Sequence, residues 1–294
     1  MKVLLTGGRG FIGRNLLENM PNDMHISAPS SREVDLTDQG SVEKYLRAEQ
    51  FDVVIHTATW NSTANSKKDT GLVLEKNLHM FFNLARLDDH FGKMIVIGSG
   101  AEYDRKHYQP RMKEEYFDQH VPTDQYGFSK YIMARSVAGM KSAVDLRVFG
   151  CFGPYEDWEI RFISNAMCKA IHGLPITLRQ NMFFDYLWVK DLVRIIDHVA
   201  RNDMMERHYN ACTGGTIDLL TLAHMVNEVT GADVPIQVEM DGLKPEYSGD
   251  NSRLMKEMTG FAFTPLPEAI RSLHGYYKDR LNEIDRNLLL SDKK

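Results

Sequence analysis

The chain has 294 residues, 43% of them hydrophobic and 26% charged, which is typical of a globular protein with a sizeable core. A formal net charge of −5 and the lack of a lysine or arginine run disfavour nucleic acid as a partner. The three cysteines lack metal-ligand spacing, so we expect reduced core residues and no metal site. The opening "MKVLLTGG" resembles neither a signal peptide nor a membrane span, and we expect a cytoplasmic protein without membrane contact.

The first two hundred residues alternate between apolar, β-rich runs and segments with helical periodicity. Strands are predicted at "KVLLT", "MHISA", "DVVIHTA", "KMIVIGS" and "AVDLRVF". Helices are predicted at "FIGRNLLENM", "QGSVEKYLRAEQ", "GLVLEKNLHMFFNLARLDDH" and "YGFSKYIMARSVAGM". This alternation predicts an α/β fold with a doubly wound parallel (Rossmann) sheet, whose ligands bind beyond the carboxyl ends of the strands.

After "FGPYED" the alternation loosens into shorter pieces, including "LPITLRQN", "HYNAC", "PIQVEM" and "SRLMKEMTG". These pieces predict a smaller mixed α/β lobe that closes over the carboxyl edge of the sheet. We predict a Rossmann domain formed by residues 1–152 and about 183–207. The substrate-binding lobe is then formed by about 153–182 and by 208–294.

The segment "TGGRGFIG" follows the first strand directly and opens the first helix. Glycines at this spacing permit a tight turn, a close approach of the backbone to a pyrophosphate, and close packing of helix on strand. The N–H groups and dipole at the start of the helix then favour the anion. The predicted cofactor-binding residues here are Gly7, Arg9, Gly10, Phe11, Ile12 and Gly13.

The end of the second strand indicates which nicotinamide cofactor is preferred. An acidic residue there would bind the adenosine ribose and repel a 2′-phosphate. The sequence is instead "APSSRE", in which Ser30, Ser31 and Arg32 offer hydroxyl donors and a cation, and Arg9 lies within reach. These residues favour NADP(H), so the Rossmann domain is predicted to bind NADP. If the segment is only a solvated turn, NAD(H) remains an alternative. Two further residues are predicted to flank the adenine: Asp35 and Leu36.

Tyr126 and Lys130, in "YGFSK", lie four residues apart and therefore share one face of the predicted helix. An ammonium group favours the ionised form of a nearby phenol, which makes such a phenol a usable general acid or base near neutral pH. The lysine is also placed to hold the nicotinamide ribose. The spacing is common by chance, but here it occurs in a chain that opens with a dinucleotide loop.

Together these features resemble the extended short-chain dehydrogenase/reductase family, which contains sugar-nucleotide epimerases, dehydratases and ketoreductases. The resemblance covers nearly the whole chain and includes "TGGRGFIG", "DLTD", "HTAT", "GSGAEYD", "YGFSK", "LRVFGCFGP", "FDYLWVKDL" and "YNACTGG". It is closest in pattern to nucleotide-sugar 4-ketoreductases such as GDP-fucose synthase. It implies that Tyr126 and Lys130 are catalytic, that Thr57, Ala58 and Thr59 line the cofactor groove, and that the protein is a homodimer.

The chain departs from the family pattern at the third catalytic position, where a serine or threonine normally donates to the substrate carbonyl. Gly100 stands there, in "GSGAEYD". Either a bulge brings Ser99 into the role, which we favour, or Tyr126 and water polarise the carbonyl and Ser99 only caps backbone. Ala101 and Glu102 replace the acid and base of the 4,6-dehydratases, so elimination of water is disfavoured.

Substrate recognition departs from the family pattern as well. Gly150 replaces an asparagine that helps to hold the substrate phosphates, and Phe184 replaces an arginine. Arg179 or Arg161 is the candidate that takes over the diphosphate. The residues predicted to line the substrate site are Glu102, Tyr103, Gly150, Arg179 and Arg253.

The leading hypothesis is an NADPH-dependent reductase of a 4-keto-6-deoxy nucleotide sugar, a small-molecule substrate. Because the acid–base pair of a dehydratase is incomplete here, simple hydride transfer is the family reaction that the residues still support. One alternative is a 4-epimerase that retains NAD. Another is a protein that senses NADP(H) without catalysis, which Gly100 supports and the Tyr126–Lys130 pair opposes.

Overall fold

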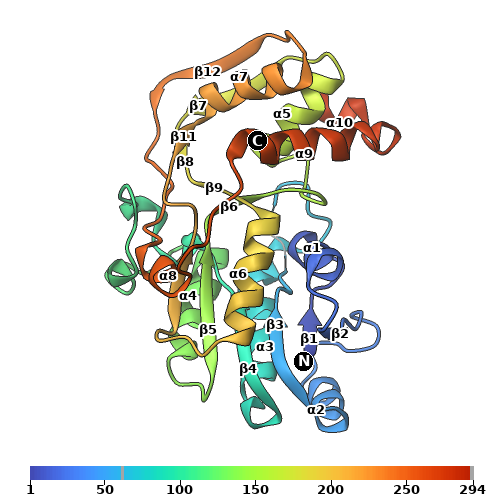
Figure 1. The fold of residues 1–294 in the computed structure, drawn as a ribbon, viewed down its shortest axis with the longest axis vertical. Helices are drawn as coiled ribbons and strands as arrows, with labels where there is room; N and C mark the ends of the chain where they lie inside the picture. Colours follow the sequence, from blue (N-terminus) through green and yellow to red (C-terminus); the bar gives the residue numbers. More distant parts are fainter. Residues whose placement is uncertain (61–62, 292–294) are drawn as a thin grey trace.

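The computed structural model describes residues 1–60 and 63–291. Its larger part is a six-stranded sheet with the order β10-β5-β4-β3-β1-β2, in which every neighbouring pair is parallel (Figure 1). The strands are β1 (Lys2–Thr6), β2 (His25–Ser27), β3 (Phe51–His56), β4 (Phe91–Ile97), β5 (Ala143–Val148) and β10 (His208–Ala211). The predicted doubly wound α/β fold is confirmed.

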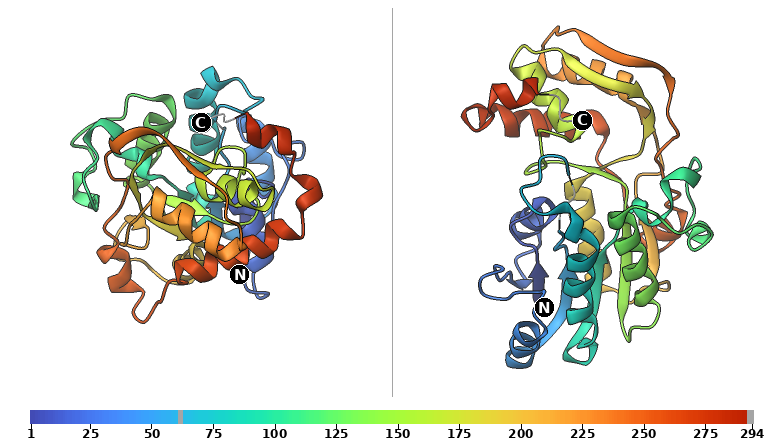
Figure 2. Two further views of the ribbon diagram at one scale, coloured as in Figure 1. Left: turned by 90° about the horizontal axis from the view of Figure 1, so that it is seen from above. Right: turned by 180° about the vertical axis from the view of Figure 1, so that it is seen from behind.

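Helices cover both faces of this sheet (Figures 1 and 2). One face packs against α1 (Phe11–Asn19) and α6 (Val189–Arg201). The other packs against α2 (Gln39–Ala48), α3 (Val73–Ala85) and α4 (Gln125–Val137). Successive side chains of β1 enter opposite cores, Val3 and Leu5 on the first face and Leu4 on the second. Burial on both faces explains why these strands are continuous apolar runs in the sequence.

The smaller lobe stands over the carboxyl ends of the strands (Figure 1). Its core lies between helices and the paired strands β7 and β12, and includes Met167, Leu222 and Leu273. Its elements are α5 (Phe162–Ile171), β7 (Ile176–Asn181), β8 (Phe183–Phe184), β11 (Ile217–Asp218), α7 (Leu219–Thr230), β12 (Ile236–Leu243), α9 (Leu266–Lys278) and α10 (Arg286–Leu290). The chain passes between the lobes through β6 (Gly150–Phe152) and β9 (Tyr186–Trp188), which pair in parallel.

The boundary predicted between residues 207 and 208 is displaced in the structure. β10 begins at His208 and pairs with β5, so it completes the main sheet instead of entering the smaller lobe. Tyr209 and Ala211 belong to the main core, and Leu254 of α8 (Ser252–Glu257) packs there too. The sheet domain therefore takes in two short segments that we had assigned to the substrate lobe.

Short 3-10 helices lie in the connections, and η3 carries the predicted site residue Glu102. They are η1 (Thr70–Leu72), η2 (Asp88–His90), η3 (Gly100–Glu102), η4 (Arg105–His107), η5 (Glu114–Tyr116) and η6 (Leu281–Glu283). Within the described ranges, no helix combines the length and apolar character that crossing a bilayer requires.

Candidate functional site

The glycine segment forms a tight turn between β1 and α1. Gly7 has a φ of +73°, and the Gly10 N–H donates to the Gly7 carbonyl at 2.9 Å. A Cβ on Gly13 would lie 2.2 Å from the Gly7 carbonyl oxygen, so only glycine lets the helix sit this close to the turn. No side chain among the described residues caps α1 at Gly10. The first N–H groups of α1, near Phe11 and Ile12, are therefore available to an anion.

The carboxyl end of β3 lies against this turn. The Thr57 hydroxyl donates to the Thr6 carbonyl at 2.7 Å, and the Ala58 N–H approaches the Thr6 hydroxyl at 3.4 Å. His56 is 1% exposed and shares a 2.9 Å hydrogen bond with the Thr6 hydroxyl. Burial, with a contribution from the charge of Lys130, lowers the pKa of His56 to about 3. His56 is therefore a neutral core residue at neutral pH.

Tyr126 and Lys130 lie at the same edge of the sheet, on α4. The Lys130 ammonium is 2.6 Å from the Ile97 carbonyl, which ends β4, and 6.0 Å from the centroid of the Tyr126 ring. Lys130 is 5% exposed, whereas Tyr126 is only partly buried. The predicted pair is thus brought together with the glycine turn and with the ends of β3 and β4.

Asn77 connects the loop after β3 to the helix that carries this pair. Its Oδ1 accepts the Trp60 N–H at 2.7 Å and the Thr59 hydroxyl at 3.4 Å. Its amide nitrogen lies 3.4 Å from the Ser129 hydroxyl, which in turn donates to the Tyr126 carbonyl at 2.8 Å. Asn77 is 2% exposed, and its hydrogen bonds link the loop after β3 to α4.

The turn after β2 contains an acidic group that the sequence reasoning left out. The Glu33 carboxylate accepts the Ser30 N–H at 2.7 Å. Hydrogen bonds from the Ser30 side chain and backbone, together with the charge of Arg9, lower the pKa of Glu33. Ser31 and Arg32 are exposed. The predicted phosphate donors are thus present, and a carboxylate competes with a phosphate for Ser30 and Arg9.

The two residues predicted beside the adenine lie just beyond this turn. The exposed Asp35 accepts both the N–H and the hydroxyl of Thr37 at 2.8 Å, which fixes the turn. Leu36 is partly buried against the second core, and its carbonyl accepts the Asn83 amide at 2.9 Å. The backbone of this segment is therefore ordered by its own hydrogen bonds.

Ser99 caps the short helix η3. Its hydroxyl accepts the Ala101 N–H at 3.1 Å, and the Glu102 carboxylate accepts the Ser99 N–H at 2.9 Å, so the two form a capping box. Ser99 is 9% exposed. Of the two roles that the sequence allows for Ser99, capping the backbone or donating to the substrate, this geometry is that of the cap. Its hydroxyl is engaged locally, and no bulge is needed to explain the residue.

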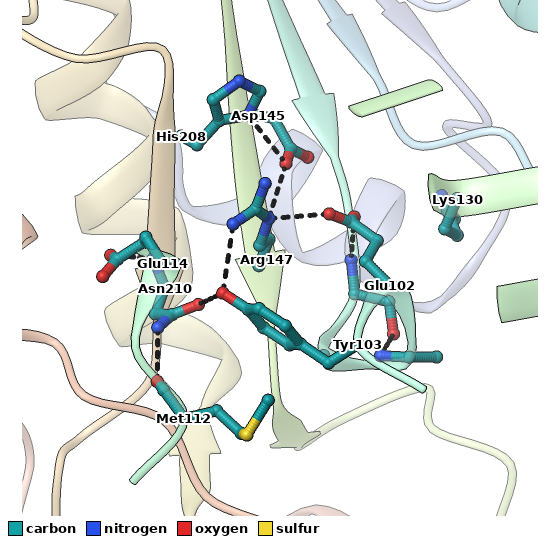
Figure 3. A network of polar contacts seen from close by, with 12 residues as sticks. Glu102, Tyr103, Met112, Glu114, Lys130, Asp145, Arg147, His208 and Asn210 are labelled. Atoms are coloured by element: carbon teal, nitrogen blue, oxygen red, sulfur yellow. Dashed lines mark hydrogen bonds and ion pairs between the residues drawn. The ribbon is translucent and has the colours of Figure 1, made fainter. Parts of the chain in front are cut away.

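Glu102 and Tyr103 point into a buried polar network (Figure 3). Arg147 of β5 donates to the Glu102 carboxylate at 2.7 Å, to Asp145 at 3.2 Å and to the Tyr103 hydroxyl at 3.0 Å. The Tyr103 hydroxyl donates to Asn210 of β10 at 2.8 Å. Both predicted substrate residues are at most 2% exposed. We therefore leave them out of the substrate site and assign them to the support beneath η3.

The remaining predicted substrate residues are dispersed. Gly150 lies in β6, where a Cβ would be 2.6 Å from the Asp185 carbonyl, so a longer side chain has no room. Arg179 is exposed on β7 of the smaller lobe. Arg253 donates to Glu115 at 2.6 Å and lies beside the start of β10, whereas a ligand would approach the carboxyl ends. These placements do not favour Arg253 as an anion ligand.

The described residues contain no cluster of three His, Cys, Asp or Glu side chains suited to a metal ion. The arrangement at the carboxyl edge suits a dinucleotide, because it joins an uncapped helix start, two strand ends and an anchored lysine.

Known proteins are similar to this chain in sequence and in fold. Over 301 residues the chain is 24% identical to GDP-6-deoxy-D-talose 4-dehydrogenase from Aggregatibacter actinomycetemcomitans, covering 97% of this chain and 99% of that protein. A 32% identical match to GDP-L-colitose synthase from Yersinia pseudotuberculosis spans 36% of this chain and 35% of that protein. The fold is that of MlghC, a GDP-mannoheptose C4 reductase from Campylobacter jejuni with NADP bound, with a TM-score of 0.80, 19% identity and coverage of 94% and 98%.

A family profile matches residues 3–212, which include the glycine turn, Tyr126, Lys130 and the whole main sheet except Lys2. The prediction of an NAD(P)-dependent enzyme is thereby confirmed at the level of the family. The chain belongs to the NAD dependent epimerase/dehydratase family.

Proposed function

We propose that this protein is an NADPH-dependent reductase of a nucleotide-linked 4-keto sugar, with 4-keto-6-deoxy sugars as the preferred class. The observation that carries the proposal is the position of Lys130, anchored 2.6 Å from the end of β4 with Tyr126 beside it. The substrate class is supported by relatives named as a GDP-6-deoxy-D-talose 4-dehydrogenase and a GDP-L-colitose synthase.

A bound nicotinamide supplies the hydride that reduces the carbonyl carbon. Tyr126 gives its hydroxyl proton to the oxygen as negative charge develops there. Lys130 stabilises the phenolate that remains, because its ammonium is held beside the ring by the Ile97 carbonyl. The uncapped start of α1 binds the pyrophosphate, and Thr57 and Ala58 hold the strand end against the glycine turn.

We propose NADPH as the preferred cofactor because Ser31 and Arg32 are exposed at the turn after β2, where a 2′-phosphate would lie, and Arg9 is exposed in the glycine turn. Glu33 opposes this preference, since its carboxylate already uses the Ser30 N–H. The ratio of kcat/KM with NADPH to that with NADH should fall in Arg32→Ala and rise in Glu33→Gln. An unchanged ratio in both variants contradicts this assignment of the turn.

Glu33 is also the observation that favours a second candidate, a nucleotide-sugar 4-epimerase that retains NAD. A carboxylate at the end of the second strand is the group that binds an unphosphorylated ribose. Protein purified with stoichiometric NAD, interconverting nucleotide hexoses without added cofactor, would establish this activity and exclude the reductase.

The proposed reduction is tested by following NADPH oxidation with GDP- and dTDP-linked 4-keto-6-deoxyhexoses. Tyr126→Phe should lower kcat by about 10²-fold or more, since the general acid is lost, with little change in the Kd for NADPH. Tyr45→Phe is the matched control, because Tyr45 of α2 stacks on Phe51 at the amino end of β3, away from the carboxyl edge. Full activity in Tyr126→Phe refutes the mechanism, and cofactor binding without turnover of any sugar favours a sensor.

A further inference from the structure

The space next to Gly100 is already filled by a hydroxyl group from a distant part of the chain. A Cβ on Gly100 would lie 2.5 Å from the Tyr247 hydroxyl oxygen and within 2.9 Å of two atoms of the Phe149 ring. A serine or threonine at residue 100 would therefore collide with Tyr247. Since a serine hydroxyl lies only about 1.4 Å from its own Cβ, the Tyr247 hydroxyl occupies the region that such a side chain would reach.

Tyr247 is held in this position by both its backbone and its ring. Its N–H donates to the Phe183 carbonyl at 2.9 Å, and its carbonyl accepts the Asp185 N–H at 3.0 Å. The ring contacts three aromatic neighbours at centroid distances of 5.2, 5.0 and 5.3 Å: Tyr108, Phe149 and Phe184. The residue as a whole is only partly buried, and these contacts fix the position of its ring.

The two phenols at this edge have different surroundings. Burial raises the pKa of Tyr247 well above its usual value, and the nearby Tyr108 and Tyr126 add to this, while a hydrogen bond with Ser99 opposes it. Tyr247 therefore keeps its proton at neutral pH and acts as a hydrogen-bond donor. Tyr126, by contrast, has the Lys130 ammonium beside its ring.

We propose that Tyr247 is a catalytic residue that donates a hydrogen bond to the carbonyl oxygen of the substrate, in place of the hydroxyl that Gly100 lacks. This role rests on the proposed reductase function. As the hydride bonds to the carbonyl carbon, the π electrons of the C=O bond move to oxygen and the proton of Tyr126 forms the new O–H bond. Tyr247 keeps its own proton and stabilises the oxygen through the hydrogen bond. Ser99 then caps η3.

Tyr247→Phe removes the hydroxyl and keeps the ring contacts. Its kcat should fall by about 10²-fold, the order found when one oxyanion-hole donor is lost, with the Kd for NADPH and the Tm unchanged. Tyr45→Phe should match the parent. If Tyr247→Phe stays within about twofold of the parent while Tyr126→Phe is inactive, the role of Tyr247 is overturned and the reductase stands.

A second measurement tests the placement without any substrate. Gly100→Ala should lower the Tm of the parent because its Cβ meets the Tyr247 hydroxyl, and should lower it less in a Tyr247→Phe background. Equal losses in both backgrounds overturn the assignment of this space to Tyr247. If the parent oxidises no NADPH with any 4-keto nucleotide sugar, the proposed function fails and the catalytic role of Tyr247 fails with it, whatever the two Tm values show.

Discussion

Replacing Arg147 with methionine removes the guanidinium that lies between the carboxylates of Glu102 and Asp145. The three side chains are at most 1% exposed, and the two ion pairs measure 2.7 and 3.2 Å. Removing one partner of a buried ion pair costs about 3–5 kcal/mol, because the other charge is left buried without compensation. Two carboxylates remain in this case, so we expect a loss of about 5 kcal/mol in the free energy of unfolding at pH 8.

The loss should depend on pH in a definite direction. Burial and the charge of Asp145 raise the pKa of Glu102 well above its usual range, and Arg147 opposes this increase. Without Arg147 that pKa rises further. An acid with a raised pKa keeps a proton in the folded state that the unfolded chain has released, so its contribution to stability is present at low pH and is lost as pH rises through the folded-state pKa. The variant should therefore be closer to the parent at about pH 5.5 than at pH 8.

Thermal unfolding followed by circular dichroism at both pH values measures this effect. About 2 °C per kcal/mol applies to a chain of this size, so the Tm should fall by about 10 °C at pH 8. Arg47→Met is the matched control, because the Arg47–Glu43 pair has a similar separation of 2.8 Å but its side chains are 59% and 37% exposed. Its Tm should change by about 2 °C or less. Equal shifts in the two variants, or a deficit independent of pH, would refute this account of the network.

Two further changes test other parts of the molecule. Glu156 accepts the Ser164 hydroxyl at 2.6 Å, and burial raises its pKa to about 8 from 4.5. The parent should therefore lose stability between about pH 4.5 and 8 in a way that Glu156→Gln does not share, and parallel Tm–pH curves contradict this. Gly13→Ala should weaken NADPH binding by about tenfold or more in calorimetry, because its Cβ meets the Gly7 carbonyl at 2.2 Å. Gly275→Ala, in an open helical position, should bind NADPH as the parent does.

The sequence predicts the elements that are determined locally. The strands β1, β3, β4 and β5 are largely buried, apolar runs, and the glycine turn and the Tyr126–Lys130 spacing are contained in short segments. β10 was assigned to the wrong lobe because its four residues give no local sign of pairing with β5, some sixty positions earlier. Only the folded chain shows that β10 belongs to the main sheet.

The same contrast between local pattern and folded structure applies to the site residues. Glu102 looks like a substrate ligand in its motif, but its partner Arg147 lies 45 positions away and draws it into the core. Glu33 has no role in the sequence-based prediction, and only the folded turn shows its carboxylate accepting the Ser30 N–H. Gly100 looks like a missing hydroxyl until Tyr247 is placed beside it. For Glu102 and Gly100 the deciding neighbour is distant in the sequence, and for Glu33 it depends on the conformation of the turn.

The position of Tyr247 makes the proposed site depend on contacts from both lobes. Lys130, with Tyr126 on the same helix, is fixed to the main sheet through the Ile97 carbonyl, and η3 is supported by Arg147. Tyr247 is instead held by Phe183 of β8, a strand of the smaller lobe. The next residue, Ser248, accepts the Met112 N–H at 3.1 Å from a loop of the sheet domain. A displacement of the smaller lobe would therefore move one proposed donor relative to Tyr126 and Lys130, so the proposed mechanism predicts that reduction needs the lobe docked on the sheet domain.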